Sequence, residues 1–199
     1  MPSHIEIVRQ WNRADAKNHS STTFKLSKNA IVFDAGAYVG AWSEKIIKKY
    51  NCNIYAFEPV PQFYKKALNT LQKYNNVKVF NYAIGGNTRK DNISLAKDGS
   101  AINKHGKLTV DVKSICDIIK ELNIEKIDLL KLNVEGSEYE ILDSMISNDI
   151  LGICNTYLIQ FHRTINEFAA RRKKIRAALS KTHKQLFNYE FVWEAWSKK

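Results

Sequence analysis

The stretch "VFDAGAYVGAWS", Val32–Ser43, decides the fold, because two glycines join a short apolar run to a helical pattern. Gly36 and Gly40 stand where a buried strand gives way to a helix. Glycine loses more backbone freedom on folding than any other residue, so its use here indicates a tight turn or a close approach to the backbone. The GxxxG spacing differs from the GxGxxG of dinucleotide-binding turns and provides no compact cradle for a pyrophosphate.

Short apolar runs alternate with helical patterns along most of the remaining chain. The expected strands of the main sheet cover residues 31–33, 53–57, 77–84, 126–132 and 156–161. The expected helices between them cover residues 41–50, 61–74, 114–122 and 137–147. This alternation requires right-handed crossovers, and it predicts an α/β fold with a mainly parallel, doubly wound sheet.

Two segments depart from this alternation. Residues 91–113 alternate like exposed strands, so we expect a small extra hairpin beside the main sheet. The polar loop of this hairpin contains Ser100 and His105 and is a candidate lid over a ligand site. Near the C-terminus we expect a basic helix over 166–182 and an antiparallel edge strand in "YEFVWEAW", 189–196.

The last fifth of the chain carries much of the positive charge. The net charge is +11, and ten Lys and Arg residues against three Glu lie from Arg163 to Lys199. A basic surface attracts nucleic acid, anionic membranes or phosphorylated substrates, or it serves solubility alone. For "RRKK", 171–174, the alternatives are a solvated helix face and a contact with an anionic acceptor. Trp193 and Trp196 are expected to share one face of the last strand, for packing or a homodimer contact.

The composition predicts one globular domain over residues 1–199, with a core over about 30–162 and the basic helix and edge strand over 163–199. Hydrophobic residues make up 44% of the chain, too many for a disordered one. The three cysteines are scattered without CxxC spacing, which favours reduced thiols and the cytoplasm. No apolar run approaches the ~20 residues of a membrane span, and the first residues lack the apolar core of a signal peptide.

The residues that end each strand are the candidates for function, because the ligand crevice of a parallel sheet lies outside the carboxyl ends of its strands. Asp34 ends the first strand, and Glu58 ends the second, 24 residues later. An acid at about this spacing accepts hydrogen bonds from both hydroxyls of a ribose. The two acids indicate a nucleoside ligand without a pyrophosphate, which S-adenosylmethionine (SAM) satisfies. Asp34 then binds the ammonium of the methionine part or orients the loop.

Four segments together resemble one family. "DAGAYVGAWS", "YAFEPVPQFYKKALNTL", "FNYAIGG" and "KLNVEGSEYEIL" occur in the order of the FkbM family of SAM-dependent methyltransferases, and close to its spacing. The family pattern is D-x-G-A-x-x-G, then F-E-P, then K-x-D-x-E-G-x-E. The resemblance covers roughly residues 30–162, and the combination is specific although no single segment is.

The resemblance implies a Rossmann-like class I methyltransferase fold, SAM as methyl donor with S-adenosylhomocysteine as product, and O-methylation of a sugar or another hydroxyl-bearing acceptor. It also assigns the cofactor to the turn after the first strand and to the ends of the next two strands. The residues so assigned are Asp34, Gly36, Ala37, Tyr38, Gly40, Ser43, Glu58, Pro59, Asn81 and Ala83. The face where donor meets acceptor is assigned to Lys131, Asn133, Glu135 and Glu138, beside His162.

The chain departs from the family pattern at Asn133, where the family has an acid. Asparagine keeps a hydrogen-bonding role but loses that of a base, so Glu135 and His162 are the candidates for the general base. The alternatives are a helix N-terminal acid for Glu135 and a strand-end histidine bonded to a loop for His162. A divalent metal held by Glu135, Glu138 and His162 is the less favoured reading, and we expect none.

Two other functions remain open at this point. The charge of +11 and the basic helix also suit an RNA methyltransferase, although no aromatic-interleaved RNA-binding motif is visible. A non-catalytic SAM-binding module is the other alternative, suggested by Asn133. The favoured partner is a small-molecule or glycan acceptor, and we expect no membrane span in this chain.

Overall fold

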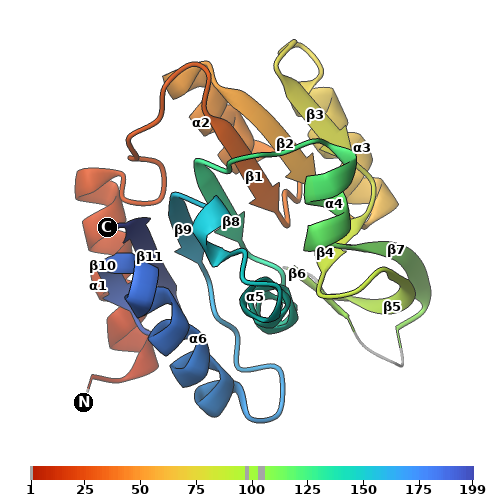
Figure 1. Ribbon diagram of the computed structural model, residues 1–199. Helices are drawn as coiled ribbons and strands as arrows, with labels where there is room; N and C mark the ends of the chain where they lie inside the picture. The colour runs from red at the N-terminus through yellow and green to blue at the C-terminus, as the bar shows by residue number, and fades with distance from the viewer. Residues whose placement is uncertain (1, 97–98, 103–105) are drawn as a thin grey trace.

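The main feature of the computed structural model is a seven-stranded sheet with helices on both faces (Figure 1). The structure describes residues 2–96, 99–102 and 106–199. The strand order is β10-β11-β9-β8-β1-β2-β3. The bounds are β1 Ile31–Ala35, β2 Asn53–Phe57, β3 Val77–Phe80, β8 Leu129–Leu132, β9 Thr156–Ile159, β10 His183–Tyr189 and β11 Trp193–Lys198. Neighbouring strands from β9 to β3 are parallel, and β11 is antiparallel to both β9 and β10. The expected doubly wound sheet with an antiparallel C-terminal edge is confirmed.

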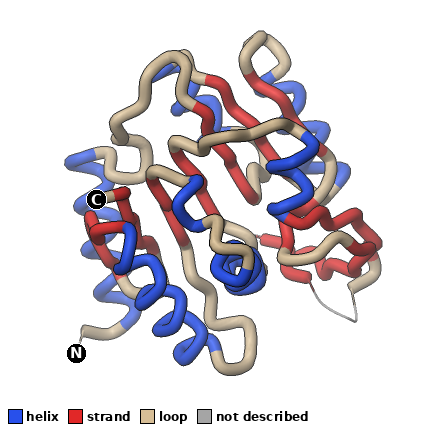
Figure 2. Tube along the Cα trace, in the orientation of Figure 1, coloured by secondary structure: helices blue, strands red, loops and turns tan. Residues whose placement is uncertain are grey.

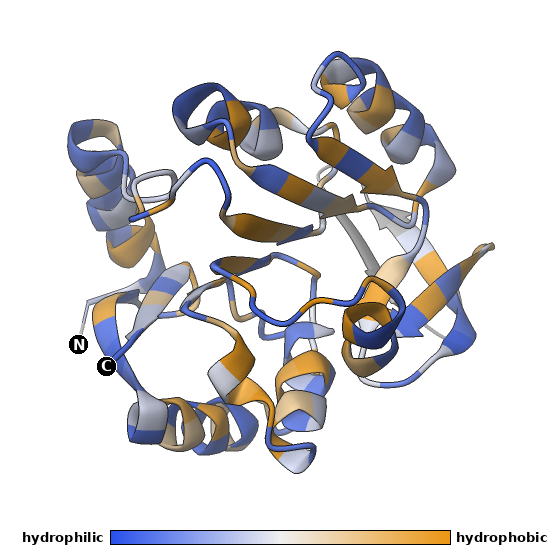
Figure 3. Ribbon diagram, turned by 45° about the horizontal axis from the view of Figure 1, so that its top comes forward, coloured by the Kyte–Doolittle hydropathy of each residue, from blue (hydrophilic) through white to orange (hydrophobic). Residues whose placement is uncertain are grey.

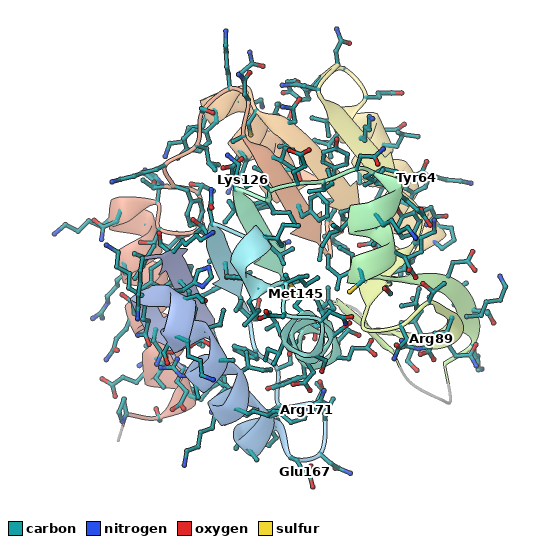
Figure 4. All side chains as sticks on the ribbon, viewed as in Figure 1. Tyr64, Arg89, Lys126, Met145, Glu167 and Arg171 are labelled. Atoms are coloured by element: carbon teal, nitrogen blue, oxygen red, sulfur yellow. The ribbon has the colours of Figure 1, made fainter. Side chains whose placement is uncertain are left out.

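The two faces of the sheet carry separate cores because successive side chains of a strand point to opposite sides. Phe33 and Leu130 face a cluster covered by α4 Ile115–Glu121, α5 Glu138–Ser147 and α6 Phe168–Thr182. Val32 and Leu129 face the other cluster, covered by α2 Ala41–Tyr50 and α3 Pro61–Leu71. Figure 3 shows the apolar residues gathered where helices and strands face each other. Met145 of α5, for example, lies between its helix and the sheet (Figure 4).

A second sheet lies beside the main one (Figure 2). Its order is β4-β7-β5-β6, with β4 Ala83–Gly85, β5 Arg89–Ala96, β6 Gly99–Ile102 and β7 Leu108–Ser114. The single strand expected over 77–84 is therefore wrong, because the chain leaves the main sheet after Phe80 and β4 pairs with β7 instead. The expected hairpin is present in β5 and β7, and β6 adds a strand in its loop. Ser100 lies in β6, whereas His105 lies outside the described residues.

The N-terminal helix α1, His4–Asn18, was not expected. Ser3 caps it by accepting from the Glu6 N–H at 3.3 Å, so the "SHIE" segment was an available signal. Its buried Trp11 packs on the outer strands, with ring centroids 5.5 Å from Phe187 and 6.3 Å from Trp193. In the part of the chain that the structure describes, no helix has both the length and the apolar character that a membrane span requires.

The C-terminal strands correct two expectations. The edge strand is β10, which shares only Tyr189 with the segment expected to form it, while β11 lies inside the sheet between β10 and β9. Trp193 and Trp196 lie on opposite faces, because residues three apart on a strand point in opposite directions. Trp196 belongs to the cluster that α6 covers, and Trp193 contacts Trp11 of α1. Packing explains both tryptophans.

Candidate active site

A buried ion pair lies at the edge of the sheet where the strands end at their carboxyl termini. Asp34 and Lys131 are register partners on β1 and β8. Lys131 Nζ donates to Asp34 Oδ1 at 2.6 Å and to the Gly36 carbonyl at 3.0 Å. Ser43 Oγ donates to Asp34 Oδ2 at 2.6 Å. Both oxygens of the fully buried Asp34 are thus bonded within the protein, which fits the loop-orienting role of the two roles expected for it.

The glycines of the first turn are required by their protein neighbours. Gly36 has φ +80°, and a Cβ added there would lie 1.9 Å from the backbone oxygen of Asn133. Gly40 has φ +81°, and a Cβ there would lie 3.0 Å from Leu71 Cδ1 of α3. The close approach that the sequence indicated is therefore made by the start of the loop after β8 and by α3, which both pack against the turn.

Glu58 holds the two loops that flank the end of β2. Its Oε2 accepts from the Tyr38 N–H at 2.8 Å, and its Oε1 accepts from the Val60 N–H at 2.9 Å. Burial raises the pKa of the Glu58 carboxyl to about 7, although these two backbone hydrogen bonds oppose the shift. Asn81 Nδ2 donates to the carbonyls of Glu58 and Pro59, both at 3.0 Å, and so fixes the same loop from β3.

The remaining cofactor candidates divide between the turn and the second sheet. Ala37 is buried, and its N–H donates to the Phe57 carbonyl at 3.0 Å. Tyr38 has φ 53° and is 45% exposed, with its ring 4.5 Å from that of Phe63. Ala83 begins β4 and packs in the small cluster that includes Phe63. Tyr38 is therefore partly exposed to solvent, whereas Ala83 is buried against protein.

The loop after β8 carries an unpaired polar atom and a strained acid. Asn133 Oδ1 is buried without a hydrogen-bond partner. Glu135 has φ 53°, a conformation that non-glycine residues seldom adopt, and Gly136 follows with φ 118°. Thr164 Oγ1 donates to the Glu135 carbonyl at 3.2 Å and lies over Gly136, so the loop after β9 holds this strained turn.

The first two residues of α5, Glu138 and Tyr139, hold His162 by hydrogen bonds. Its backbone N–H donates to Glu138 Oε1 at 2.7 Å, and its ring Nδ1 lies 3.3 Å from the same oxygen. The Tyr139 hydroxyl donates to the His162 carbonyl at 2.7 Å. Ring Nε2 lies 3.3 Å from Glu135 Oε1, an ion-pair distance without hydrogen-bond alignment, and it is buried without a hydrogen-bond partner.

The charges of these three side chains are coupled. Burial lowers the pKa of His162, but the carboxylates of Glu135 and Glu138 outweigh it and raise this pKa to about 9. The same contact with His162 lowers the pKa of Glu135 against the effect of burial. At neutral pH the imidazole is therefore a cation between two carboxylates, and the set carries one net negative charge. Glu135, one third exposed, is its accessible member.

The described residues contain no group of three or more His, Cys, Asp or Glu side chains arranged to hold a metal ion. In the set above, the two ring nitrogens of His162 face different carboxylates, so the donors do not converge on one point. The residues that sequence reasoning missed here are Tyr139 and Thr164, whose contacts join segments 23 and 29 positions apart. No local signal marks such contacts.

The arginines of the basic helix form ion pairs within the protein. Arg171 pairs with Asp143 of α5 at 2.6 Å and lies beside that helix in Figure 4. Arg172 is buried and pairs with Glu190 at 3.0 Å and Glu194 at 3.1 Å. These ion pairs replace the solvated face expected for Arg171 and Arg172, and the contact with an anionic acceptor stays a prediction. Lys173 and Lys174 are exposed.

Comparison with known sequences gives two findings. The family model described as the methyltransferase FkbM domain matches residues 34–190. The chain is 27% identical over 165 residues to methyltransferase sdnD of Sordaria araneosa, covering 63% of this chain and 64% of that protein.

Comparison with solved structures shows the same fold in distant proteins. Methyltransferase FkbM from Methylobacillus flagellatus KT gives a TM-score of 0.57 at 17% identity, over 88% of this chain and 45% of that chain. The fibrillarin/Nop5p complex gives a TM-score of 0.57 at 11% identity, over 94% of this chain and 81% of that chain. The chain spans less than two thirds of sdnD and less than half of the FkbM chain.

Proposed function

Because this chain belongs to the family of methyltransferases that carry an FkbM domain, we propose that it transfers the methyl group of SAM to a hydroxyl of a sugar or glycan acceptor. When bound, SAM supplies a methyl group on a positively charged sulfur, which is already activated toward a nucleophile. The protein then has to align the acceptor oxygen with the methyl carbon and remove one proton. Alignment alone is worth up to about 7–11 kcal/mol of the barrier.

The donor set at the ends of β1 and β2 fits this cofactor. Each oxygen of Glu58 accepts one backbone N–H and keeps a further lone pair for a ribose hydroxyl. Hydroxyl donors stabilise the charged carboxylate, so they offset the burial that raises the pKa of Glu58. Tyr38, half exposed beside Glu58, supplies an aromatic surface next to the same position.

The observation that carries the proposal is the buried Asn133 Oδ1, which has no hydrogen-bond partner, together with the buried His162 Nε2, whose contact with Glu135 Oε1 at 3.3 Å lacks hydrogen-bond alignment. Asn133 follows β8 and His162 follows β9, and these are neighbouring parallel strands, so both residues lie at the same edge of the sheet. A buried polar atom without a partner costs about 1–3 kcal/mol, and a ligand that supplies the missing partner recovers this cost. A cofactor or acceptor group bound at this edge would do so.

We assign the acceptor's proton to Glu135. With SAM bound, the acceptor oxygen would take the methyl group while the carbon–sulfur electron pair stays on sulfur, and the Glu135 carboxylate would accept the proton that the hydroxyl loses. The protonated His162 lacks a free lone pair for this task at neutral pH, since its pKa is about 9. A general base contributes about 10²–10⁴-fold, and the low pKa of Glu135 places its contribution toward the small end.

The ion pairs of α6 favour a neutral acceptor over RNA. Arg171, Arg172 and Arg176 all pair with acids of the same chain. The acceptor side of the crevice carries the net negative charge of the Glu135–His162–Glu138 set, which repels phosphates. Uncharged hydroxyl groups suffer no such repulsion.

The test is transfer of labelled methyl from SAM to a panel of glycosides and, in parallel, to total RNA. We expect glycoside labelling that falls about tenfold or more in Glu135→Gln, with SAM affinity kept. The matched control is Glu125→Gln, which changes an exposed acid that precedes β8 and so lies away from the carboxyl ends of the strands. Labelling of RNA alone would replace the proposed acceptor class, and SAM binding without transfer to either would indicate the non-catalytic module. Repeating the assay with a chelator tests for a metal requirement.

A further inference from the structure

Glu138 has no role in the transfer described above, yet its fully buried carboxylate has three contacts. Oε2 accepts from the Gly136 N–H at 2.8 Å, and Oε1 accepts from the backbone N–H of His162 at 2.7 Å. Oε1 also lies 3.3 Å from ring Nδ1 of His162. A single side chain therefore ties the strained turn that carries Glu135 to the backbone and the ring of His162.

The position of the Glu138 carboxylate fixes the orientation of the protonated ring. An acceptor-only oxygen beside Nδ1 requires a proton on that nitrogen. Nε2 then faces Glu135 Oε1 at 3.3 Å. With Tyr139 bound to the His162 carbonyl, both the backbone and the ring orientation of His162 are determined by the start of α5.

We propose that Glu138 is a positioning residue, which holds the ring of His162 between two carboxylates and so sets the charge and direction of the Glu135 carboxylate that receives the acceptor's proton. The inference rests on the proposed function. It assigns Glu138 no contact with substrate, and its effect on the reaction passes through His162.

The charges around His162 agree with this role. Glu135 comes from the loop after β8 and Glu138 from the first turn of α5. Arg163, the next residue along the chain, has its guanidinium over the Phe191 ring, 4.3 Å from the ring centroid. The two carboxylates explain why the ring remains protonated at neutral pH, and loss of either one should make the proton easier to remove.

The experiment measures the imidazole pKa of His162 by NMR in the whole chain with labelled histidine, together with the pH profile of methyl transfer. In Glu138→Gln we expect the pKa of His162 to fall by about one unit or more toward its ordinary value. We expect kcat to fall about tenfold or more, because His162 and with it the Glu135 carboxylate lose their fixed direction. KM and SAM affinity should stay within about twofold, because Glu138 touches neither ligand. Glu138→Asp keeps the charge but moves it back by one methylene. Its kcat and its His162 pKa should therefore lie between those of the wild-type protein and those of Glu138→Gln.

The matched control is Tyr139→Phe, which removes a hydrogen bond to the same residue but leaves both carboxylates in place. If Glu138 were merely structural, Glu138→Gln and Tyr139→Phe would lower kcat alike, and the pKa of His162 would stay unchanged in both variants. An equal loss of kcat, or an unchanged pKa of His162 in Glu138→Gln, overturns the inference. If Glu138→Gln does not fold, Glu138→Asp carries the test, and an unchanged pKa of His162 in that variant contradicts it.

The two proposals fail in distinguishable ways. A wild-type protein that transfers no methyl group to any hydroxyl acceptor overturns the proposed function and, with it, the role given to Glu138. That outcome leaves the pKa of His162 high in the wild-type protein. An active wild-type protein with an unshifted His162 in Glu138→Gln overturns only the role of Glu138.

Discussion

Lys131 Nζ lies 2.6 Å from Asp34 Oδ1, and this ion pair joins the ends of β8 and β1 beneath the first turn. Both side chains are almost completely buried, at 5% and 0% exposure. Lys131 also donates to the Gly36 carbonyl, so it holds the loop that follows β1 in place. The pair adds no net charge to the site, and its contribution is the shape of the turn that we propose to hold the cofactor.

Replacement of Lys131 by Met should therefore destabilise the fold strongly. The buried Asp34 carboxylate would lose its cation, which costs about 3–5 kcal/mol in the free energy of unfolding. The matched change is Lys126→Met, which removes an exposed lysine from its ion pair with the half-buried Asp128 and should cost at most about 1 kcal/mol, because Asp128 keeps its hydrogen bonds from Ile31 and Asn155. Urea unfolding compares the two. Equal losses would mean that the buried pair does not stabilise the fold as argued.

Gly36→Ala should disrupt the turn. Its Cβ would lie 1.9 Å from the Asn133 carbonyl oxygen, which is backbone and has no room to move away. We expect a loss of about 3 kcal/mol or more in unfolding free energy. At Gly152 an added Cβ meets nothing within 4 Å, so Gly152→Ala should change the same quantity by about 0.5 kcal/mol or less. A Gly36→Ala protein as stable as Gly152→Ala would refute the steric explanation.

Glu58→Ala should weaken SAM binding at least about tenfold, or 1.4 kcal/mol. The variant removes the carboxylate assigned to the ribose and frees the Tyr38 and Val60 N–H groups that it holds. Isothermal calorimetry with SAM or its demethylated product measures this. Glu135→Ala, on the acceptor side, serves as the comparison and should keep its affinity within about twofold. Unchanged affinity in Glu58→Ala would remove the ribose assignment.

Asn133→Asp restores the acid of the family pattern and should leave SAM affinity nearly unchanged, within about threefold. The new side chain presents an oxygen at the position of the buried Oδ1, and the backbone contacts of residue 133 with β1 are kept. The same calorimetric titration checks this. A collapse of binding would show that the neutral amide, rather than its oxygen alone, is required at this position.

Unfolding free energy should fall as the pH rises across the titration of His162. The pKa of His162 is raised from 6.5 to about 9 in the folded protein, so the folded state binds a proton that the unfolded chain releases. The stabilisation is complete below pH 6.5 and is lost as the pH rises through about 9, up to roughly 3 kcal/mol in all. Urea unfolding at several pH values in this range measures how steeply the unfolding free energy falls with pH, and this fall should be smaller in His162→Gln than in the wild-type protein. An equal dependence on pH in both proteins would contradict the assigned charge of His162.

The sequence by itself determined the order of most elements. Apolar runs such as 53–57 and helical faces such as 61–71 are local patterns, so periodicity locates them without knowledge of the fold. Local reasoning was wrong where pairing decides. Residues 77–84 read as one apolar strand, but β3 pairs with β2 whereas β4 pairs with β7. Which strand pairs with which depends on residues remote in the chain.

The sequence also placed Asp34, Glu58, Lys131 and Glu135 near strand ends, because a parallel sheet brings its carboxyl ends to one edge. Only the tertiary structure decided what each does there. Asp34 and Lys131 neutralise each other across two strands, and a histidine 24 positions from Glu138 becomes a cation between two acids. The physical reason is that charge state follows from burial and from neighbours within a few ångströms, and the fold sets those neighbours independently of their distance along the chain.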